Sequence, residues 1–172
     1  ALLMATLRAG LRFEVARRKE LSDIATTLNA FLYESSTIGK FATFFYAQLQ
    51  PETGGLTSVN AGHNYPLVLG HDGSIKQLEK GGTILGMFPD DMLRQIGAYE
   101  QETTQLYSGD TVLFYTDGVT ETENLEGEQY GEERLEAVFQ RQRHATAAEI
   151  CTAIHDSVLE FQGEAQQFDD LT

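Results

Sequence analysis

The chain has 172 residues, 41% of them hydrophobic, which is typical of one soluble globular domain large enough to bury a core. Its formal net charge of -14 is concentrated in residues 101–172, where three Lys/Arg face sixteen Asp/Glu, and this argues against nucleic acid as a partner because phosphates need cationic neutralisation. No apolar run approaches the roughly 20 residues that span a bilayer, and the single cysteine, Cys151, permits no internal disulfide, so we expect a cytoplasmic protein.

Two amphipathic helices are predicted within residues 1–35, which should pair as a helical hairpin. The first has apolar residues at every fourth position: Leu3, Leu7, Leu11 and Val15. The second has its own buried face: Ile24, Leu28, Phe31 and Leu32. The first stripe is open to two interpretations, packing against a sheet or a seam for a homodimer or interdomain contact. Because Ala1 lies inside a helical pattern with no cap and no methionine before it, we expect a fragment of a longer protein.

Antiparallel strands are predicted within residues 41–121. The segment Phe41–Leu49 alternates with a period of two, and since both faces are largely apolar we expect a central strand covered on both sides. Asp72-Gly73 predicts a tight hairpin, and Pro89-Asp90-Asp91 predicts a turn in a mobile loop region. The other strands are expected at residues 56–61, 65–69, 75–78, 96–106 and 111–114.

A second helix pair is predicted within residues 131–162. Its helices should cover residues 131–143 and 147–161, with Thr146 as the cap of the latter. The chain order is therefore a helix pair, several strands and another helix pair, without the alternation of strand and helix that builds a parallel sheet. This order predicts an α+β fold of antiparallel sheets flanked by helices.

The segment Phe114–Glu121 carries the strongest functional signal. Asp117 follows an apolar run predicted to be a buried strand, and Gly118 lets the backbone turn or approach a ligand closely. At the very end of the chain, Asp169 and Asp170 follow a polar run that predicts a loop. Because carboxylate oxygens are the donors that hard divalent cations prefer, these three aspartates are the candidate metal ligands. The residues alone leave open whether they converge.

Six segments, in this order, resemble the metal-dependent protein serine/threonine phosphatases of the PPM type, in the bacterial branch of SpoIIE- and RsbU-like enzymes. They cover nearly the whole chain: Ala1-Leu2-Leu3-Met4-Ala5, Phe41–Tyr46, Asn60–Pro66, Leu85-Gly86, Tyr115–Glu121 and Asp169–Thr172. The resemblance implies a single domain over residues 1–172. Its fold would be an α/β/β/α sandwich of two antiparallel sheets flanked by helix pairs, incomplete at the N-terminus.

The resemblance also implies a two-metal site that holds Mn²⁺ or Mg²⁺ and a water that attacks phosphorus. Asp117 and Asp169 would match two of the metal-binding, catalytic aspartates. Asp170 would stand where relatives often carry Asn, so Asp169 is the preferred ligand of that pair. Relatives carry Gly-Asp motifs, one of which supplies a bridging aspartate, before the segment that matches Ala1–Ala5. This chain lacks them, so the resemblance implies little or no activity for these residues alone.

The implied function is dephosphorylation of phosphoserine or phosphothreonine on a partner protein. In the resembling branch that partner is an anti-sigma-factor antagonist of bacterial partner-switching and stress signalling, and the first helices connect the phosphatase to an N-terminal sensory or regulatory domain. Two alternatives stay open. The chain could be a catalytically inactive phosphatase-like binding module, or a metal-dependent hydrolase of small phosphate esters.

Two further sets of residues are open to a functional and a structural interpretation. His63 lies in a loop between strands and could contact substrate or an outer-shell group, or it could shape the turn. Cys151 and His155 are four residues apart on a predicted helix and could form half of a zinc site, or they could simply belong to a helix face.

Overall fold

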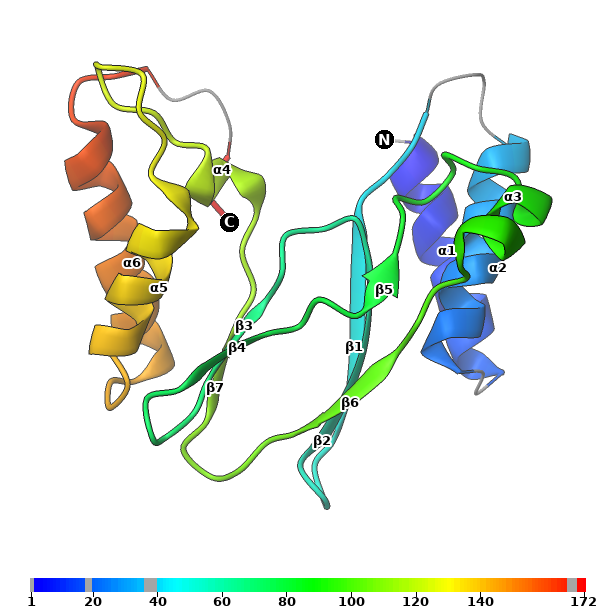
Figure 1. The fold of residues 1–172 in the computed structure, drawn as a ribbon, viewed down its shortest axis with the longest axis horizontal. Coiled ribbons are helices and arrows are strands. Elements are labelled where there is room, and N and C mark those ends of the chain that lie inside the picture. The colour runs from blue at the N-terminus through cyan, green and yellow to red at the C-terminus, as the bar shows by residue number, and fades with distance from the viewer. Residues whose placement is uncertain (1, 18–19, 36–39, 167–169) are drawn as a thin grey trace. The chain divides into compact units, whose positions relative to one another are not determined.

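The computed structural model describes residues 2–17, 20–35, 40–166 and 170–172, and the chain divides into two compact units (Figure 1). Unit 1 comprises Ala1–His63 and Glu79–Leu106, and unit 2 comprises Asn64–Leu78 and Tyr107–Thr172. Each unit has its own sheet and its own apolar core. Within the described ranges, no helix is both long enough and apolar enough to cross a membrane.

Unit 1 is built around strand β2. Its elements are α1 (Leu2–Ala16), α2 (Leu21–Ser35), β1 (Phe44–Gln50), β2 (Gly55–Ala61), β5 (Gly81–Gly82), α3 (Asp90–Ile96) and β6 (Glu102–Gln105). β2 pairs antiparallel with β1 and β6 and makes a short parallel pairing with β5. The register places Phe44 opposite Ala61 and Gly55 opposite Gln105. The predicted strand at residues 56–61 is confirmed, and the broad strand at 96–106 is reduced to β6.

The helical hairpin predicted for residues 1–35 is confirmed. Helix α2 buries its apolar face against the residues of β2 that include Val59 and Ala61. From the stripe of α1, Leu7 is buried in the same core, and Leu11 and Val15 pack against it. These contacts match the packing interpretation of the stripe. A homodimer or interdomain contact through α1 stays a prediction.

A buried amide joins α2 to the loop that precedes α3. The side chain of Asn29 is fully buried. Its Nδ2 donates to the carbonyl oxygen of Phe88 at 3.0 Å, and its Oδ1 accepts from the backbone N–H of Gly86 at 2.8 Å. The hydroxyl of Tyr99, whose pKa is raised by burial, also points to Oδ1 at 3.5 Å. One side chain of α2 therefore fixes two backbone groups of a loop 57 and 59 residues further on.

Two predictions for unit 1 are wrong. The turn expected at Pro89-Asp90-Asp91 is the start of helix α3, with Pro89 at its N-cap and both aspartates in its first turn. Acidic residues there favour a helix because they offset the positive end of its dipole. The strand expected to be central, β1, lies at an edge of the sheet in the described part of the chain, and it is half-buried or exposed. Apolar residues on both faces do not reveal how many strands pair with a segment.

Unit 2 holds a second, antiparallel sheet with the order β4-β3-β7. Its elements are β3 (Leu67–Leu69), β4 (Ile75–Gln77), β7 (Thr111–Leu113), α4 (Asp117–Thr120), α5 (Gly131–Arg141) and α6 (Ala147–Gln162). The predicted cap Thr146 is confirmed: its Oγ1 accepts from the backbone N–H of Glu149, whose carboxylate accepts from the N–H of Thr146. This reciprocal pair is a capping box.

The core of unit 2 is formed by β3 and the inner faces of α5 and α6. Its largest fully buried side chains include Tyr130 and Phe139, and the hydroxyls of Tyr130 and Ser157 are 2.8 Å apart. The strand expected to be buried at residues 111–114 is only half-buried, and Phe114 is 55% exposed, which corrects that prediction. β7 lies at an edge of the described sheet, so its side chains have fewer neighbours than those of β3.

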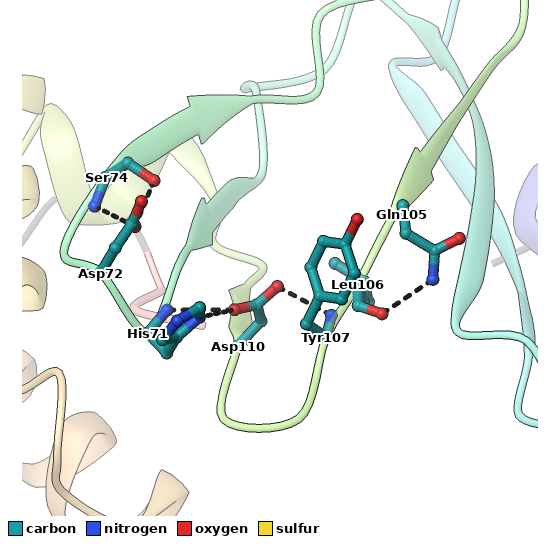
Figure 2. Close-up of polar contacts among 7 residues, drawn as sticks. All are labelled: His71, Asp72, Ser74, Gln105, Leu106, Tyr107 and Asp110. Atoms are coloured by element: carbon teal, nitrogen blue, oxygen red, sulfur yellow. Dashed lines mark hydrogen bonds and ion pairs between the residues drawn. The ribbon is translucent and has the colours of Figure 1, made fainter.

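Two carboxylates fix the turns of unit 2 (Figure 2). Asp110 accepts the backbone N–H groups of Tyr107 at 2.9 Å and His71 at 3.0 Å, and it lies 3.6 Å from Nδ1 of His71. In the β3–β4 hairpin that Asp72-Gly73 predicted, Asp72 accepts both the N–H and the hydroxyl of Ser74. These contacts join the hairpin to the turn that leads into β7.

The fold class is confirmed as α+β, with two mainly antiparallel sheets and a helix pair packed on each sheet. The segment predicted as strands, residues 41–121, also contains α3 and the parallel pairing of β5. That residues 1–172 form a single domain stays a prediction.

Candidate functional site

Asp117 stands at the point where the chain leaves the sheet of unit 2. It opens the four-residue helix α4, after Thr116 in an extended conformation, rather than ending a buried strand. Its side chain is exposed, and Oδ1 accepts the N–H of Gly118 at 3.0 Å. Its backbone oxygen accepts the N–H of Glu121 at 2.8 Å, so both the backbone and the side chain of Asp117 are hydrogen-bonded. The carboxylate is therefore fixed in place and open to a cation from solvent.

The C-terminal segment lies beside this point. The backbone N–H of Thr116 donates to the carbonyl oxygen of Thr172 at 3.1 Å, and the hydroxyl of Thr116 donates to the carbonyl oxygen of Asp170 at 3.3 Å. In Figure 1 the C-terminus is accordingly seen next to α4. Asp170 is exposed, whereas Asp169 lies outside the described residues. Two acidic segments that are far apart in the sequence thus meet at Thr116.

The donor chemistry of these segments fits a hard divalent cation. Carboxylate oxygens are the ligands of Mg²⁺ and Mn²⁺, and such ions retain water in the positions that the protein leaves open. Asp117 and Asp170 would hold the ion in this part of the chain. Within the described ranges, no group of three or more His, Cys, Asp or Glu side chains is arranged as a metal site. The assignment of Asp117, Asp169 and Asp170 as metal ligands stays a prediction.

An apolar pocket of about 410 Å³ adjoins the C-terminal segment within unit 2. It is lined mainly by apolar side chains, among them Leu113, Ile154 and Leu171. The buried hydroxyl of Tyr115 finds no hydrogen-bond partner among the described residues, and burial, with a smaller effect of Glu132 and Glu136, raises its pKa to about 12. Such a mainly apolar surface, with no Lys or Arg among the described residues that line it, does not suit a phosphate group.

Cys151 and His155 also line this pocket, from an exposed face of α6. The described residues place no second pair of ligands beside them, and the imidazole Nδ1 of His155 lies 3.6 Å from the carboxylate of Asp156. This arrangement matches the interpretation of a helix face rather than half of a zinc site.

His63 uses its backbone to close a turn. Its N–H donates to Oδ1 of Asn60 at 2.8 Å, and its carbonyl oxygen accepts from Nδ2 of Asn60 at 2.9 Å. Asn60 is buried and was missed as a determinant of this turn, although Asn is among the residues that favour turns. The contacts favour the turn-shaping interpretation of His63.

The sequence matches the model of the family described as stage II sporulation protein E (SpoIIE) over residues 1–172. The chain is a member of the SpoIIE family. This result confirms the resemblance to the PPM-type phosphatase domains of the SpoIIE and RsbU branch. Both Asp117 and the C-terminal aspartates lie inside the matched range.

Two curated relatives and one solved structure show the extent of the similarity. Phosphoserine phosphatase RsbU of Bacillus subtilis is 28% identical over 152 residues, which are 88% of this chain and 43% of that protein. Protein IcfG of Synechocystis sp. is 26% identical over 152 residues, which are 88% of this chain and 23% of that protein. The chain therefore spans less than half the length of these relatives.

The solved structure of the SiaA-PP2C domain of Pseudomonas aeruginosa superposes with a TM-score of 0.82 at 18% identity. The match covers 99% of this chain and 67% of that chain. At this identity the likeness concerns the fold, and it identifies the fold of this SpoIIE-family chain as that of PP2C phosphatase domains.

Proposed function

We propose that this chain belongs to a metal-dependent phosphatase that removes phosphate from serine or threonine of a partner protein. The observation that carries the proposal is the meeting of the Asp117 and Asp170 segments at Thr116, within a chain that matches the SpoIIE family throughout. The name of the relative RsbU, a phosphoserine phosphatase, supports this substrate class. As the resemblance to the SpoIIE and RsbU branch implies, we further propose an anti-sigma-factor antagonist of a bacterial partner-switching pathway as the partner, and an N-terminal regulatory domain that controls the enzyme.

The residues of the chain would bind and orient the cation, and the cation would supply the chemistry of the reaction. A bound Mn²⁺ or Mg²⁺ lowers the pKa of a water molecule and offsets charge on phosphoryl oxygens. Asp117 and Asp169, together with Asp170, would hold the cation from two segments that are far apart in the sequence. The hydrogen bond from Gly118 to Oδ1 of Asp117 fixes the direction of that carboxylate. The exposure of Asp117 leaves room for a phosphorylated side chain of a protein substrate.

The test is a Mn²⁺-dependent phosphatase assay of the full native gene product on a phosphoserine protein substrate, beside Asp117→Asn and Asp169→Asn. We expect each variant to lose at least about 100-fold in kcat, the scale on which removal of one electrostatic stabiliser acts. Asp156→Asn is the matched control, since Asp156 is an exposed carboxylate on α6 of the same unit. It should retain the wild-type rate.

Retention of activity in both aspartate variants would remove the metal-ligand assignment. A wild-type protein that binds the phosphoprotein without releasing phosphate would instead support the binding-module alternative. Equal efficiency on a small phosphate ester and on the phosphoprotein would support general hydrolysis of phosphate esters.

A further inference from the structure

Thr116 connects two segments that no local feature of the chain brings together. Its backbone N–H and its hydroxyl donate to two carbonyl oxygens of the same C-terminal segment, those of Thr172 and Asp170. The hydroxyl contact joins residues 54 positions apart. Because the two bonds start from one residue, they fix both the register and the distance of the C-terminal segment relative to Asp117.

The hydroxyl of Thr116 is not used in the way that its position predicts. Thr116 is the N-cap of α4, with φ -99° and ψ 163°. A threonine in that position usually accepts an N–H of the first helical turn through its side chain. Here Thr116 makes no such cap hydrogen bond, and its hydroxyl donates to Asp170 instead. The side chain therefore serves the contact between the two segments rather than the start of the helix.

We propose that Thr116 is a positioning residue that holds the Asp117 segment and the C-terminal segment with Asp170 at the separation that a shared divalent cation requires. This inference rests on the proposed function. Asp117 follows Thr116 directly and is itself fixed by Gly118 and Glu121, whereas the C-terminal segment is tied to it through Thr116. Because the C-terminal segment is already held in place, binding of the ion does not have to order it. The Thr116 hydroxyl therefore raises the affinity for the ion without contacting the ion.

The experiment compares Thr116→Val, Thr116→Ser and wild type in the full native gene product, with Mn²⁺ alone as the probe. Valine keeps the shape and the backbone N–H but removes the hydroxyl, and serine restores the hydroxyl. Thr27→Val is the matched control, because Thr27 on α2 also donates its hydroxyl to a backbone oxygen, that of Asp23 at 2.9 Å. The readouts are the Mn²⁺ concentration for half of the maximal rise in Tm, and that for half-maximal phosphatase activity.

We expect Thr116→Val to raise both Mn²⁺ midpoints by roughly fivefold to tenfold, the scale on which one net hydrogen bond acts. At saturating Mn²⁺ its kcat should return to within about twofold of wild type, which loss of the fold would not allow. Thr116→Ser and Thr27→Val should keep the wild-type midpoints.

Equal midpoints in Thr116→Val and wild type would overturn the inference, as would a serine variant that behaves like valine, or a wild-type protein that binds no Mn²⁺. A wild-type protein that binds Mn²⁺ but releases no phosphate contradicts the proposed function instead. The Tm titration then still decides the role of Thr116, because it needs no turnover.

Discussion

Two loops of unit 1 and two turns of unit 2 are fixed by different chemistry. In unit 1, the neutral amides of Asn29 and Asn60 bind backbone groups of the loops around them. In unit 2, the carboxylates of Asp110 and Asp72 do the same. An amide does not titrate, whereas a carboxylate loses part of its capacity to accept hydrogen bonds when it is protonated. The loops held by Asn29 and Asn60 should therefore be insensitive to acid, whereas the turns held by Asp72 and Asp110, whose pKa values are lowered, should loosen as the pH falls through those values.

Two glycines, one in each unit, are required for different reasons. Gly81 of β5 runs so close to β2 that a Cβ atom there would lie 1.7 Å from the carbonyl oxygen of Asn60. In unit 2, Gly127 has a positive φ of 76°, and nothing lies within 4 Å of where its Cβ would be. The first glycine is required for a close approach of two backbones, and the second only for the conformation of a turn.

The largest expected effect comes from Gly81→Ala. Because the clash is with backbone that no side-chain rotation can relieve, we expect a loss of about 4 kcal/mol in the free energy of unfolding. Gly127→Ala is the matched control and should lose about 1 kcal/mol, the strain of one left-handed residue. Urea unfolding followed by circular dichroism measures both. Equal losses of unfolding free energy in the two variants would show that the backbones of β5 and β2 do not approach each other as closely as the structure shows.

The next effect comes from Asn29→Leu, which keeps the approximate shape of the side chain and removes both of its polar atoms. The N–H of Gly86 and the carbonyl oxygen of Phe88 then lose their partner, and we expect a loss of about 3 kcal/mol. This loss should be the same at pH 5 and pH 8, since no group that titrates between them is removed. A strong pH dependence of the loss would contradict the neutral character of this contact.

Periodicity predicted the helices well, because the apolar faces of α1, α2, α5 and α6 repeat with the helical period. It failed for α3, where Pro89 and two aspartates were interpreted as a turn although they also suit a helix start. It also could not assign β1 to an edge, since pairing depends on hydrogen-bonding neighbours that the segment itself does not encode.

The candidate site was predictable only in part. Asp117 stood out because a carboxylate and a glycine follow an apolar strand, and the resemblance added the C-terminal aspartates. The contact through Thr116 depends on a pairing 54 residues apart, and no pattern within either segment specifies it. Asn29 was missed for a related reason: a single amide beside an apolar stripe does not show which loop it will bind.

The smallest of the three effects, and the sharpest test of the comparison, comes from Asp110→Asn. Burial by itself raises the pKa of Asp110, but the N–H groups of Tyr107 and His71, with the His71 imidazole, outweigh burial and hold the pKa below its ordinary value. A carboxyl whose pKa is lowered by folding stabilises the protein above its unfolded pKa of about 4, and this stabilisation is lost as the pH falls through the lowered value.

At pH 7 we expect Asp110→Asn to lower Tm by about 3 to 6 °C, through weaker hydrogen bonds to Tyr107 and His71. The difference from wild type should shrink as the pH is lowered below about 4, because the wild-type carboxyl is then protonated as well. Glu149→Gln is the matched control: the pKa of Glu149 is also lowered, by its bonds with Thr146, but its side chain is exposed. Its Tm should change by no more than about 1 °C. Equal changes in Tm in both variants, independent of pH, would contradict this prediction. They would mean that the buried Asp110 carboxylate stabilises its turn no more than an exposed carboxylate does.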